Sequence, residues 1–309
     1  MISLSPEDTA EVLAQALPYI QRFHDRVVVV KYGGNAMTPQ ADAAFAADVV
    51  LMHSVGIRPV VVHGGGPQIT DLMARLGKKA TFKNGLRVTD AESLEITRMV
   101  LVGKVNRELV SSINRHGPLA VGISGEDAGT IQATMRDPEL GFVGDVSAVH
   151  PALLNQLLAQ NLIPVIATIG VDRHGQAFNI NADTVAGAVA VALDAEKVIF
   201  LTDIDGLRRN VDDPASLTSR CSAGELRLLI DEGTVSSGMI PKVDACLAAV
   251  EGGVRSAHLI DGRRPHVLLL ELFTDAGIGT MITRHNNQSA GFAGKPASTS
   301  RGNHRGDAQ

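Results

Sequence analysis

The segment Val27–Asn35, VVVVKYGGN, decides the fold class. Four β-branched residues in a row are typical of a strand that is buried on both faces. Lys31 follows this run and stands beside Gly33 and Gly34, so a positive charge lies next to accessible backbone N–H groups. That combination suits a phosphoryl group. A lysine and a glycine turn at a strand end are also common without any ligand, so this loop alone does not establish a site.

A second glycine loop, His63-Gly64-Gly65-Gly66, follows the apolar residues 59–62 and opens a helical pattern. Glycine lets the backbone approach an anion closely, and a helix N-terminus adds a favourable potential. The chain contains no G-x-x-x-x-G-K-[ST] motif, and Ile69 replaces the last glycine of a dinucleotide fingerprint. A tight strand–helix turn remains the alternative, but two such loops after two strands favour an anion site.

Strands and helices alternate outward from these loops. All-apolar strands that alternate with helices predict an α/β fold, an open αβα sandwich with a mostly parallel central sheet. An Asn84-Gly85 turn predicts a hairpin, and Thr89-Asp90-Ala91-Glu92 predicts a capping box for one long helix. We expect strands at 27–30, 59–62, 119–122, 163–169 and 197–201, and helices near 41–55, 67–76, 90–115, 151–160 and 183–193.

The composition excludes several classes of protein. The 309 residues include 28 Lys plus Arg against 33 Asp plus Glu, a net charge of −5, and only 3% are aromatic, which disfavours nucleic-acid binding. Cys221 and Cys246 are too few for a disulfide framework and fit reduced thiols. The start carries no signal peptide, and the apolar stretch Val185–Leu193 falls short of the roughly 20 residues of a membrane span. We therefore expect a cytoplasmic protein that contacts no membrane.

Both ends of the chain differ from its middle. Ser5-Pro6 begins a helix with an apolar face over residues 6–23, and Pro18 should kink it. Such a helix either packs on its own core or forms an exchange arm between subunits. Residues 284–309 are polar and rich in Gly and Ser, which predicts a disordered tail. His285 and His304 show no metal-ligand spacing, and we assign no metal site.

Charged residues stand at further helix and strand ends. Asp183 precedes an Ala/Val-rich helix as its N-cap or as an acid of its first turn. Lys242 follows Gly238 just inside another helix, where it opposes the helix dipole, which hints at an anionic ligand. Asp203 ends a strand at the sheet edge where nucleotides commonly bind, although Asp-Gly is also an ordinary turn.

The order of these motifs resembles the amino acid kinase family, and within it the branch that acts on N-acetyl-L-glutamate. The resemblance covers about residues 24–283 and is most specific at 84–89 and 179–183. It implies an N-terminal arm (1–24), an amino-acid substrate lobe (25–175) and a nucleotide lobe (176–283). The motifs are KYGGN (31–35), HGGGP (63–67), NGLRVT (84–89), NINAD (179–183), LTDIDG (201–206) and SGMIPK (237–242).

The resemblance also implies a reaction, in which the side-chain carboxylate of N-acetyl-L-glutamate attacks the γ-phosphorus of ATP, with Mg²⁺ carried by the nucleotide. Lys31 and Lys242 would stabilise the moving phosphoryl group, and Asp183 would orient them. A carboxylate nucleophile is already ionised at neutral pH, so no general base is needed. The implied binding residues are Gly65, Gly66, Arg87 and Asn179 for the amino acid, and Gly33, Gly34, Asp203 and Gly238 for the phosphates and ATP.

Regulation is the last implication of the resemblance. The N-terminal helix recurs in arginine-inhibited relatives, where paired helices join dimers into a hexamer. Glu271 and Gly277 would then contact the inhibitor L-arginine. For Glu271 alone, an apolar core helix with an exposed acid is the simpler interpretation, but together with the N-terminal helix the segment predicts feedback inhibition by L-arginine. Nothing in the sequence calls for a PII-type regulator. A kinase for another amino acid or for carbamate, and a non-catalytic amino-acid sensor on the same fold, remain alternatives.

Overall fold

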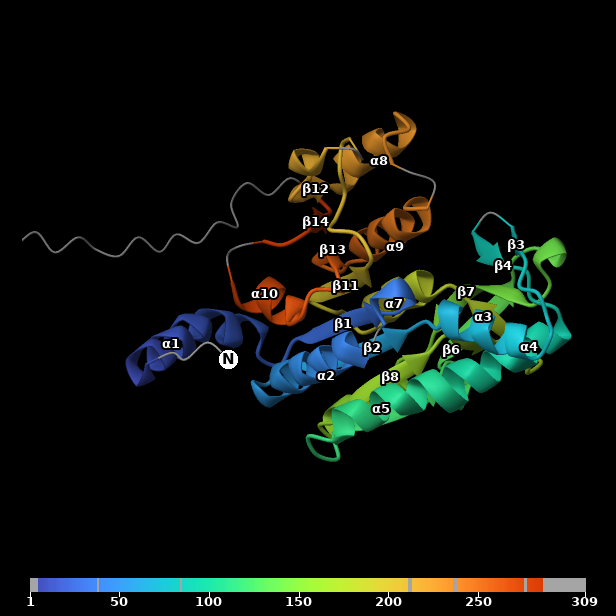
Figure 1. Cartoon of the computed structure of the whole chain (residues 1–309), viewed down its shortest axis with the longest axis horizontal. Helices are drawn as coiled ribbons and strands as arrows, with labels where there is room; N and C mark the ends of the chain where they lie inside the picture. Colours follow the sequence, from blue (N-terminus) through green and yellow to red (C-terminus); the bar gives the residue numbers. More distant parts are fainter. Residues whose placement is uncertain are drawn as a thin grey trace, which may run out of the picture.

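The computed structural model describes residues 5–37, 39–83, 85–210, 213–235, 238–274 and 277–285. Most of the predicted tail, and Asn84 of the predicted hairpin turn, lie outside the described residues. An eight-stranded sheet crosses the molecule in the order β12-β14-β13-β11-β1-β2-β8-β5 (Figure 1). Its pairs are parallel except β13 with β14, so a mostly parallel sheet is confirmed. Its strands are β1 (Val27–Tyr32), β2 (Arg58–His63), β5 (Ala120–Ser124), β8 (Ile163–Ala167), β11 (Lys197–Thr202), β12 (Arg220–Ser222), β13 (Ser256–Asp261) and β14 (Thr280–Thr283).

Alternate residues of the central strand β1 are buried in two separate hydrophobic cores, one on each face of the sheet. The fold is therefore an αβα sandwich. Val29 packs with the residues of α7 (Ala182–Ala192) and α9 (Ile240–Glu251), whereas Val28 and Val30 pack with those of α2 (Pro39–Ser54), α5 (Asn106–Asn114) and α10 (Val267–Phe273). Each fully buried valine stabilises the fold by about 1.5–3 kcal/mol, so covering both faces holds the layers together. Further helices are α3 (Gly66–Arg75), α6 (Ala152–Ala159) and α8 (Ala223–Asp231). Short helical turns are η1 (Gly34–Ala36), η3 (Asp127–Gly129), η4 (Pro138–Leu140) and η5 (Pro214–Ser216).

The long helix predicted over 90–115 is present but contains a wide turn. It consists of α4 (Ala91–Arg98), a π-helical segment η2 (Met99–Val105) and α5 (Asn106–Asn114). π-helical turns are rare and occur frequently at functional sites. The predicted capping box was wrong: Asp90 is the N-cap, and its carboxylate accepts from the Ser93 N–H at 2.7 Å. The Thr89 hydroxyl instead donates to the Arg87 carbonyl.

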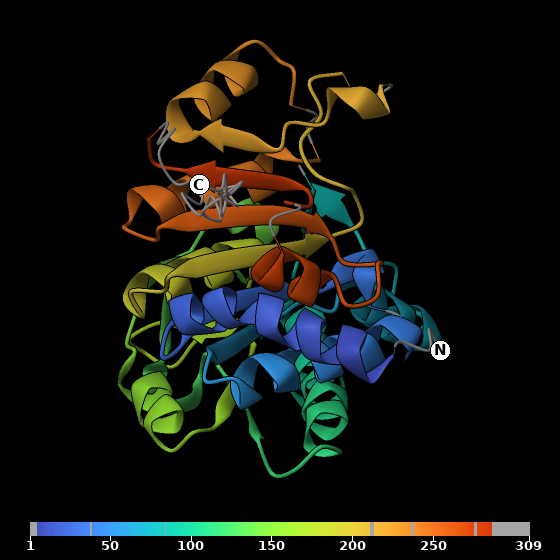
Figure 2. The ribbon, with the colours of Figure 1, turned by 90° about the vertical axis from the view of Figure 1, so that its left-hand side faces the viewer.

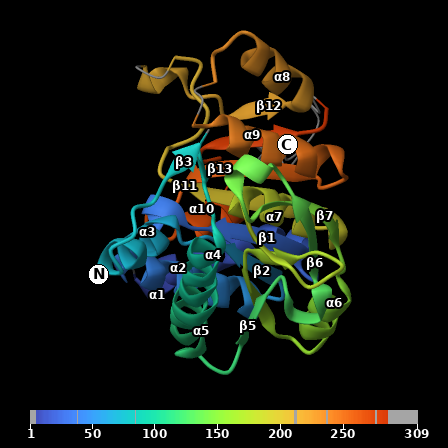
Figure 3. The same cartoon turned by 90° about the vertical axis from the view of Figure 1, so that its right-hand side faces the viewer.

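Two smaller sheets lie at the end of the molecule where the glycine loops are. The antiparallel pair β3 (Phe82–Lys83) and β4 (Leu86–Arg87) forms the predicted hairpin, with Gly85 in the left-handed region at φ 77°. The strand predicted at 163–169 divides into β8 and β9. The second small sheet closes on itself and consists of β6 (Ile131–Met135), β7 (Val143–Val149), β9 (Ile169–Val171) and β10 (Ala177–Ile180). In Figure 3, α5 lies on one side of β1 and β2, and this closed sheet lies on the other side.

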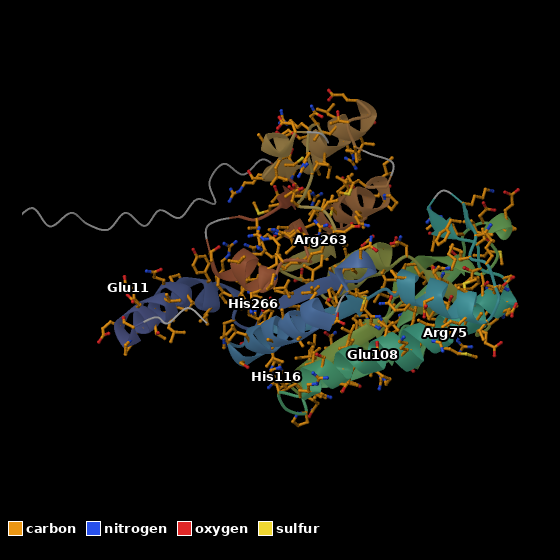
Figure 4. The ribbon with its side chains drawn as sticks, viewed as in Figure 1. Glu11, Arg75, Glu108, His116, Arg263 and His266 are labelled. Carbon is orange, nitrogen blue, oxygen red and sulfur yellow. The ribbon has the colours of Figure 1, made fainter. Side chains whose placement is uncertain are left out.

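Helix α1 (Pro6–Phe23) extends from the body and continues through Pro18. Ser5 and Asp8 form its capping box, and its C-terminal part lies beside α10 (Figure 2). Its apolar residues Leu13 and Leu17 are 68% and 51% exposed, so the described part of the chain leaves much of this apolar face uncovered. Glu11 points away from the body in Figure 4. Among the described residues, no helix is long and apolar enough to cross a membrane.

Helix α10 is tied to the sandwich at its first turn. His266, labelled in Figure 4, caps α10 in the left-handed conformation, and its Nδ1 lies 2.7 Å from Oδ1 of Asp48 in α2. Asp48 is almost fully buried, and burial raises the pKa of its carboxyl group. This contact fixes the segment that carries Glu271 against the rest of the fold.

Candidate active site

One buried carboxylate lies between two lysines that come from distant parts of the chain. Asp183 Oδ1 lies 3.0 Å from Lys31 Nζ, and Asp183 Oδ2 lies 3.5 Å from Lys242 Nζ. Lys31 is the next-to-last residue of β1, whereas Lys242 lies in the first turn of α9, as the sequence predicts. The structure therefore brings together the three residues that the sequence assigned to catalysis.

Local capping explains where Asp183 points. The N-cap of α7 is Asn181, whose Oδ1 accepts from the N–H of Asp183 at 2.8 Å, so Asp183 is the first-turn acid rather than the cap. Burial opposes its ionisation, but Lys31 and Lys242 outweigh burial and hold the pKa of Asp183 below its usual value. Asp183 is therefore ionised at neutral pH and balances one of the two ammonium charges.

The two glycine loops touch each other beside Lys31. A Cβ on Gly33 would lie 3.0 Å from the backbone nitrogen of Gly64, so a larger residue would push against the backbone of the second loop. Gly34 has φ 68°, a conformation that favours glycine. Among the described residues, no group accepts a hydrogen bond from the N–H groups of Gly65 or Gly66. These donors are available to an anion at the start of α3.

An inner cavity of about 210 Å³ lies in front of these groups. Lys31, Gly65 and Gly66 line it together with the polar side chains of Arg87 and Asn179. Asn179 Nδ2 donates to the Thr89 hydroxyl at 3.3 Å, which leaves its amide oxygen directed elsewhere. The cavity therefore combines cationic, amide and backbone N–H groups, a set that recognises a small anionic ligand with a carboxylate.

Arg87 is held in a fixed orientation at the wall of the inner cavity. Its Nη2 donates to the Gly66 carbonyl at 2.9 Å and to the Thr70 hydroxyl at 2.7 Å, and its Nη1 donates to the Met73 sulfur at 3.3 Å. The guanidinium also lies 4.8 Å from the centre of the Phe82 ring. Burial lowers the pKa of Arg87, which shows that the charge is poorly solvated. Two of its five N–H groups have no partner among the described residues and are available to a carboxylate.

Two wider hollows adjoin the lysines. An outer cavity of about 830 Å³ includes Lys242 and Asp203, and Gly33 and Gly34 line its entrance from β1. Asn35 Nδ2 donates to Asp203 Oδ2 at 2.8 Å. This hydrogen bond lowers the pKa of Asp203 and outweighs burial, which acts to raise it. Gly238 lies in a groove of about 1090 Å³ between α7 and α9 that also reaches Lys242. Asp203 and Gly238 thus lie near the lysines, on their outer side.

Glu271 and Gly277 lie together in another place. They line a cavity of about 820 Å³ whose other wall includes Tyr19 and Arg22 of α1. Glu271 Oε1 lies 2.8 Å from Lys197 Nζ and 2.7 Å from His258 Nδ1. Burial opposes ionisation of Glu271, but these neighbours lower its pKa to about 2. Oε2 of Glu271 has no hydrogen-bond donor among the described residues.

Sequence reasoning missed the residues that support these sites. Lys197 begins the apolar run 197–201. A charged residue at the start of a buried strand could have indicated that it pairs with a buried acid. Asn35 belongs to a recognised motif, but its contact with Asp203 joins segments far apart in the chain. Asn106, which contacts the buried ring of His63, lies within a helical pattern that gave no signal at all.

Comparisons with known proteins identify relatives of this chain. A model of the amino acid kinase family matches residues 26–261. An acetylglutamate kinase of Moorella thermoacetica is 49% identical over 91% of this chain and 99% of its own length, and one of Nocardia farcinica is 53% identical over 91% and 95%.

Solved structures show the same fold. N-acetylglutamate synthase from Neisseria gonorrhoeae, complexed with coenzyme A and N-acetyl-glutamate, superposes with a TM-score of 0.79 at 28% identity. The match covers 89% of this chain and 63% of that one, so this chain spans less than two thirds of the synthase. Carbamate kinase from Giardia lamblia bound to AMP-PNP has a TM-score of 0.65 at 16% identity over 84% of this chain and 99% of its own, a likeness of fold alone.

Proposed function

Because the chain belongs to the amino acid kinase family and groups with its acetylglutamate kinases, we propose that it phosphorylates the side-chain carboxylate of N-acetyl-L-glutamate with ATP, a step of arginine biosynthesis. The observation that carries the proposal is Asp183 between Lys31 and Lys242, next to a cavity that presents Arg87. Two cations beside free N–H donors suit the transfer of a phosphoryl group to an anionic acceptor.

The roles of the residues follow from their positions. A carboxylate oxygen of the substrate forms a bond to the γ-phosphorus of ATP while the bond from that phosphorus to the β,γ-bridging oxygen breaks, giving an acyl phosphate and ADP. Lys31 and Lys242 would neutralise charge on the moving group from opposite sides, and Asp183 would keep them apart and oriented. The N–H groups of Gly65 and Gly66 would donate to carboxylate or phosphoryl oxygens. Arg87 would bind the α-carboxylate, and Asn179 would lie at the acetamido group.

The nucleotide is proposed to enter from the outer cavity. Its phosphates would approach Lys242, Gly33 and Gly34, with Mg²⁺ carried by the nucleotide and Asp203 and Gly238 at its edge. On this proposal the substrate lobe is 25–175 and the nucleotide lobe is 176–283. The buried free thiols of Cys221 and Cys246 fit the cytoplasm, where we place the reaction.

Release of ADP tests the activity directly. We expect turnover with N-acetyl-L-glutamate and MgATP and much less with glutamate, aspartate or carbamate, measured in parallel. A preference for one of those acceptors would support a different kinase of the same family. Binding of N-acetyl-L-glutamate without any ADP release would support an amino-acid sensor and contradict the proposed catalysis.

Inhibition by L-arginine is the second part of the proposal. The cavity between α1 and α10 supports it, because a guanidinium could reach Oε2 of Glu271 near the backbone of Gly277. We expect Glu271→Gln to raise the arginine concentration for half inhibition about tenfold, the loss of a charge-assisted hydrogen bond. An unchanged inhibition curve, or the absence of inhibition in the unmodified protein, would contradict this site.

The exposed apolar face of α1 supports a role in assembly. We propose that Leu13 and Leu17 pack against a second copy of α1 and that this contact joins dimers into a hexamer. Removing residues 1–23 should then yield dimers with weaker arginine inhibition. Light scattering measures the mass, and an unchanged mass would rule out the arm.

A further inference from the structure

His63 ends β2 with a fully buried side chain, yet it has no part in the reaction proposed above. Its ring lies behind the second glycine loop. Nδ1 lies 3.0 Å from the Gly64 carbonyl oxygen, and Nε2 lies 3.1 Å from Nδ2 of Asn106. A neutral imidazole has one donor nitrogen and one acceptor nitrogen, so these two partners decide where the proton lies.

The orientation of Asn106 settles the question. Its Nδ2 lies 2.8 Å from the Val165 carbonyl oxygen and 3.4 Å from the Ile123 carbonyl oxygen, and its Oδ1 accepts from the guanidinium of Arg107. Carbonyl oxygens need a donor, so the NH₂ group faces Val165 and Ile123. Because His63 Nε2 at 3.1 Å is nearer than the Ile123 oxygen, we assign the second N–H mainly to His63. Nε2 of His63 is therefore the acceptor, and Nδ1 carries the proton and donates to Gly64. Burial lowers the pKa of His63 to about 4, which keeps the ring neutral at pH 7.

This hydrogen bond has a consequence on the other side of the peptide group. In a trans peptide the carbonyl and the next N–H point in opposite directions. Holding the Gly64 carbonyl against His63 therefore turns the N–H of Gly65 away from the ring, and the loop faces the inner cavity with Lys31 on that side. A run of three glycines has little conformational preference of its own, so its peptide orientation depends on outside contacts.

We propose that His63 is a positioning residue whose Nδ1–H holds the Gly64 carbonyl and so keeps the Gly65 N–H aimed at the reacting oxygens, with Asn106 fixing the tautomer. This inference rests on the proposed kinase function, because it assigns a purpose to the free N–H of Gly65. The π-helical segment supports the same loop from another side, since a Cβ on Gly65 would lie 2.7 Å from Leu101 Cδ2.

A matched pair of variants separates positioning from packing. His63→Asn keeps a donor near the place of Nδ1, whereas His63→Gln keeps a polar group near Nε2 and loses the donor to Gly64. We expect kcat to fall about tenfold or more in His63→Gln and less than about threefold in His63→Asn, since misplacing a catalytic group by 1 Å costs up to about 10²-fold. The KM for ATP should change little in both.

The control is His53→Gln, the same change at a histidine whose Nε2 contacts the Asn161 carbonyl at 2.9 Å away from the site. It should leave kcat unchanged. A kcat within twofold of the unmodified protein in His63→Gln, or equal losses in both His63 variants that follow their melting temperatures, would overturn the proposal. If the unmodified enzyme shows no turnover, the proposed function fails instead.

Nitrogen NMR of the histidine rings tests the geometry without any activity. We expect His63 to be the neutral form with the proton on Nδ1 between pH 6 and 8. A proton on Nε2, or a charged ring in this range, would overturn the proposal whatever the kinase assay shows, and the result stands if a variant does not fold.

Discussion

Replacing Asp183 by asparagine removes the one negative charge between Lys31 and Lys242. At the observed separations of 3.0 and 3.5 Å, each attraction is worth about 5 kcal/mol at an effective dielectric constant of about 20. Part of this offsets the cost of burying the charges, so the expected net loss is about 3–5 kcal/mol in the free energy of unfolding, as for a buried pair that loses one partner. The new NH₂ group would also face an ammonium group.

Catalysis should suffer along with stability in Asp183→Asn. Both lysines lose the group that orients them, so we expect kcat to fall about 10²-fold. Urea unfolding at pH 7 measures the first effect, and coupled ADP release measures the second. The control is Asp25→Asn, which breaks an exposed pair with Arg58 at 2.9 Å and should cost less than about 1 kcal/mol. If Asp183→Asn keeps kcat within threefold and loses less than 1 kcal/mol, Asp183 does not organise the lysines.

Three further results are expected. Arg87→Lys should raise the KM for N-acetyl-L-glutamate about tenfold with kcat nearly unchanged, because one hydrogen bond to a charged group is worth about 1.5–3 kcal/mol; a fall in kcat alone would contradict a binding role. Gly65→Ala should cost about 1–3 kcal/mol through the clash with Leu101 Cδ2 and lower kcat, and adding Leu101→Val should restore part of both; no recovery in the double variant would refute the clash. Burial lowers the pKa of His63 and that of His258 in the folded protein from 6.5 to about 4. Between pH 6.5 and pH 4 the unfolded chain therefore binds more protons than the folded protein. The free energy of unfolding should fall as the pH drops through this range. Urea unfolding at pH 7 and at pH 5 measures this loss of stability, and His258→Asn should make the loss smaller. An equal free energy of unfolding at pH 7 and pH 5 would contradict the claim that both histidines are buried in the neutral form.

The fold was largely predictable because its central strands are apolar on both faces. The runs at 27–30, 59–62 and 197–201 are β1, β2 and β11, which lie side by side in the sheet. Strand β13, with the sequence SAHLID, was missed because its buried Ser256 and His258 break the apolar pattern. Their polar groups lie against each other and against Glu271, and such contacts cannot be seen along the chain.

The candidate site was predictable where each residue adjoins a strand or helix end. Lys31, Asp183 and Lys242 stand at such ends, and the parallel sheet gathers them at one edge. What the sequence could not supply is the contact between elements, such as Asn106 behind His63, because a helical residue gives no sign of which strand it faces. Thr89 was mistaken for a cap because the competing carboxylate of Asp90 reaches the Ser93 N–H.

The continuous sheet limits how the two proposed lobes can move and whether either lobe can fold alone. The proposed lobes meet where β1 pairs with β11 in parallel, deep inside one eight-stranded sheet, so the boundary is a row of hydrogen bonds rather than a linker. The sheet runs across this boundary, so a change in the angle between the lobes would have to bend the sheet itself. A gene fragment that encodes one lobe would leave a long apolar strand with a bare edge, which invites aggregation.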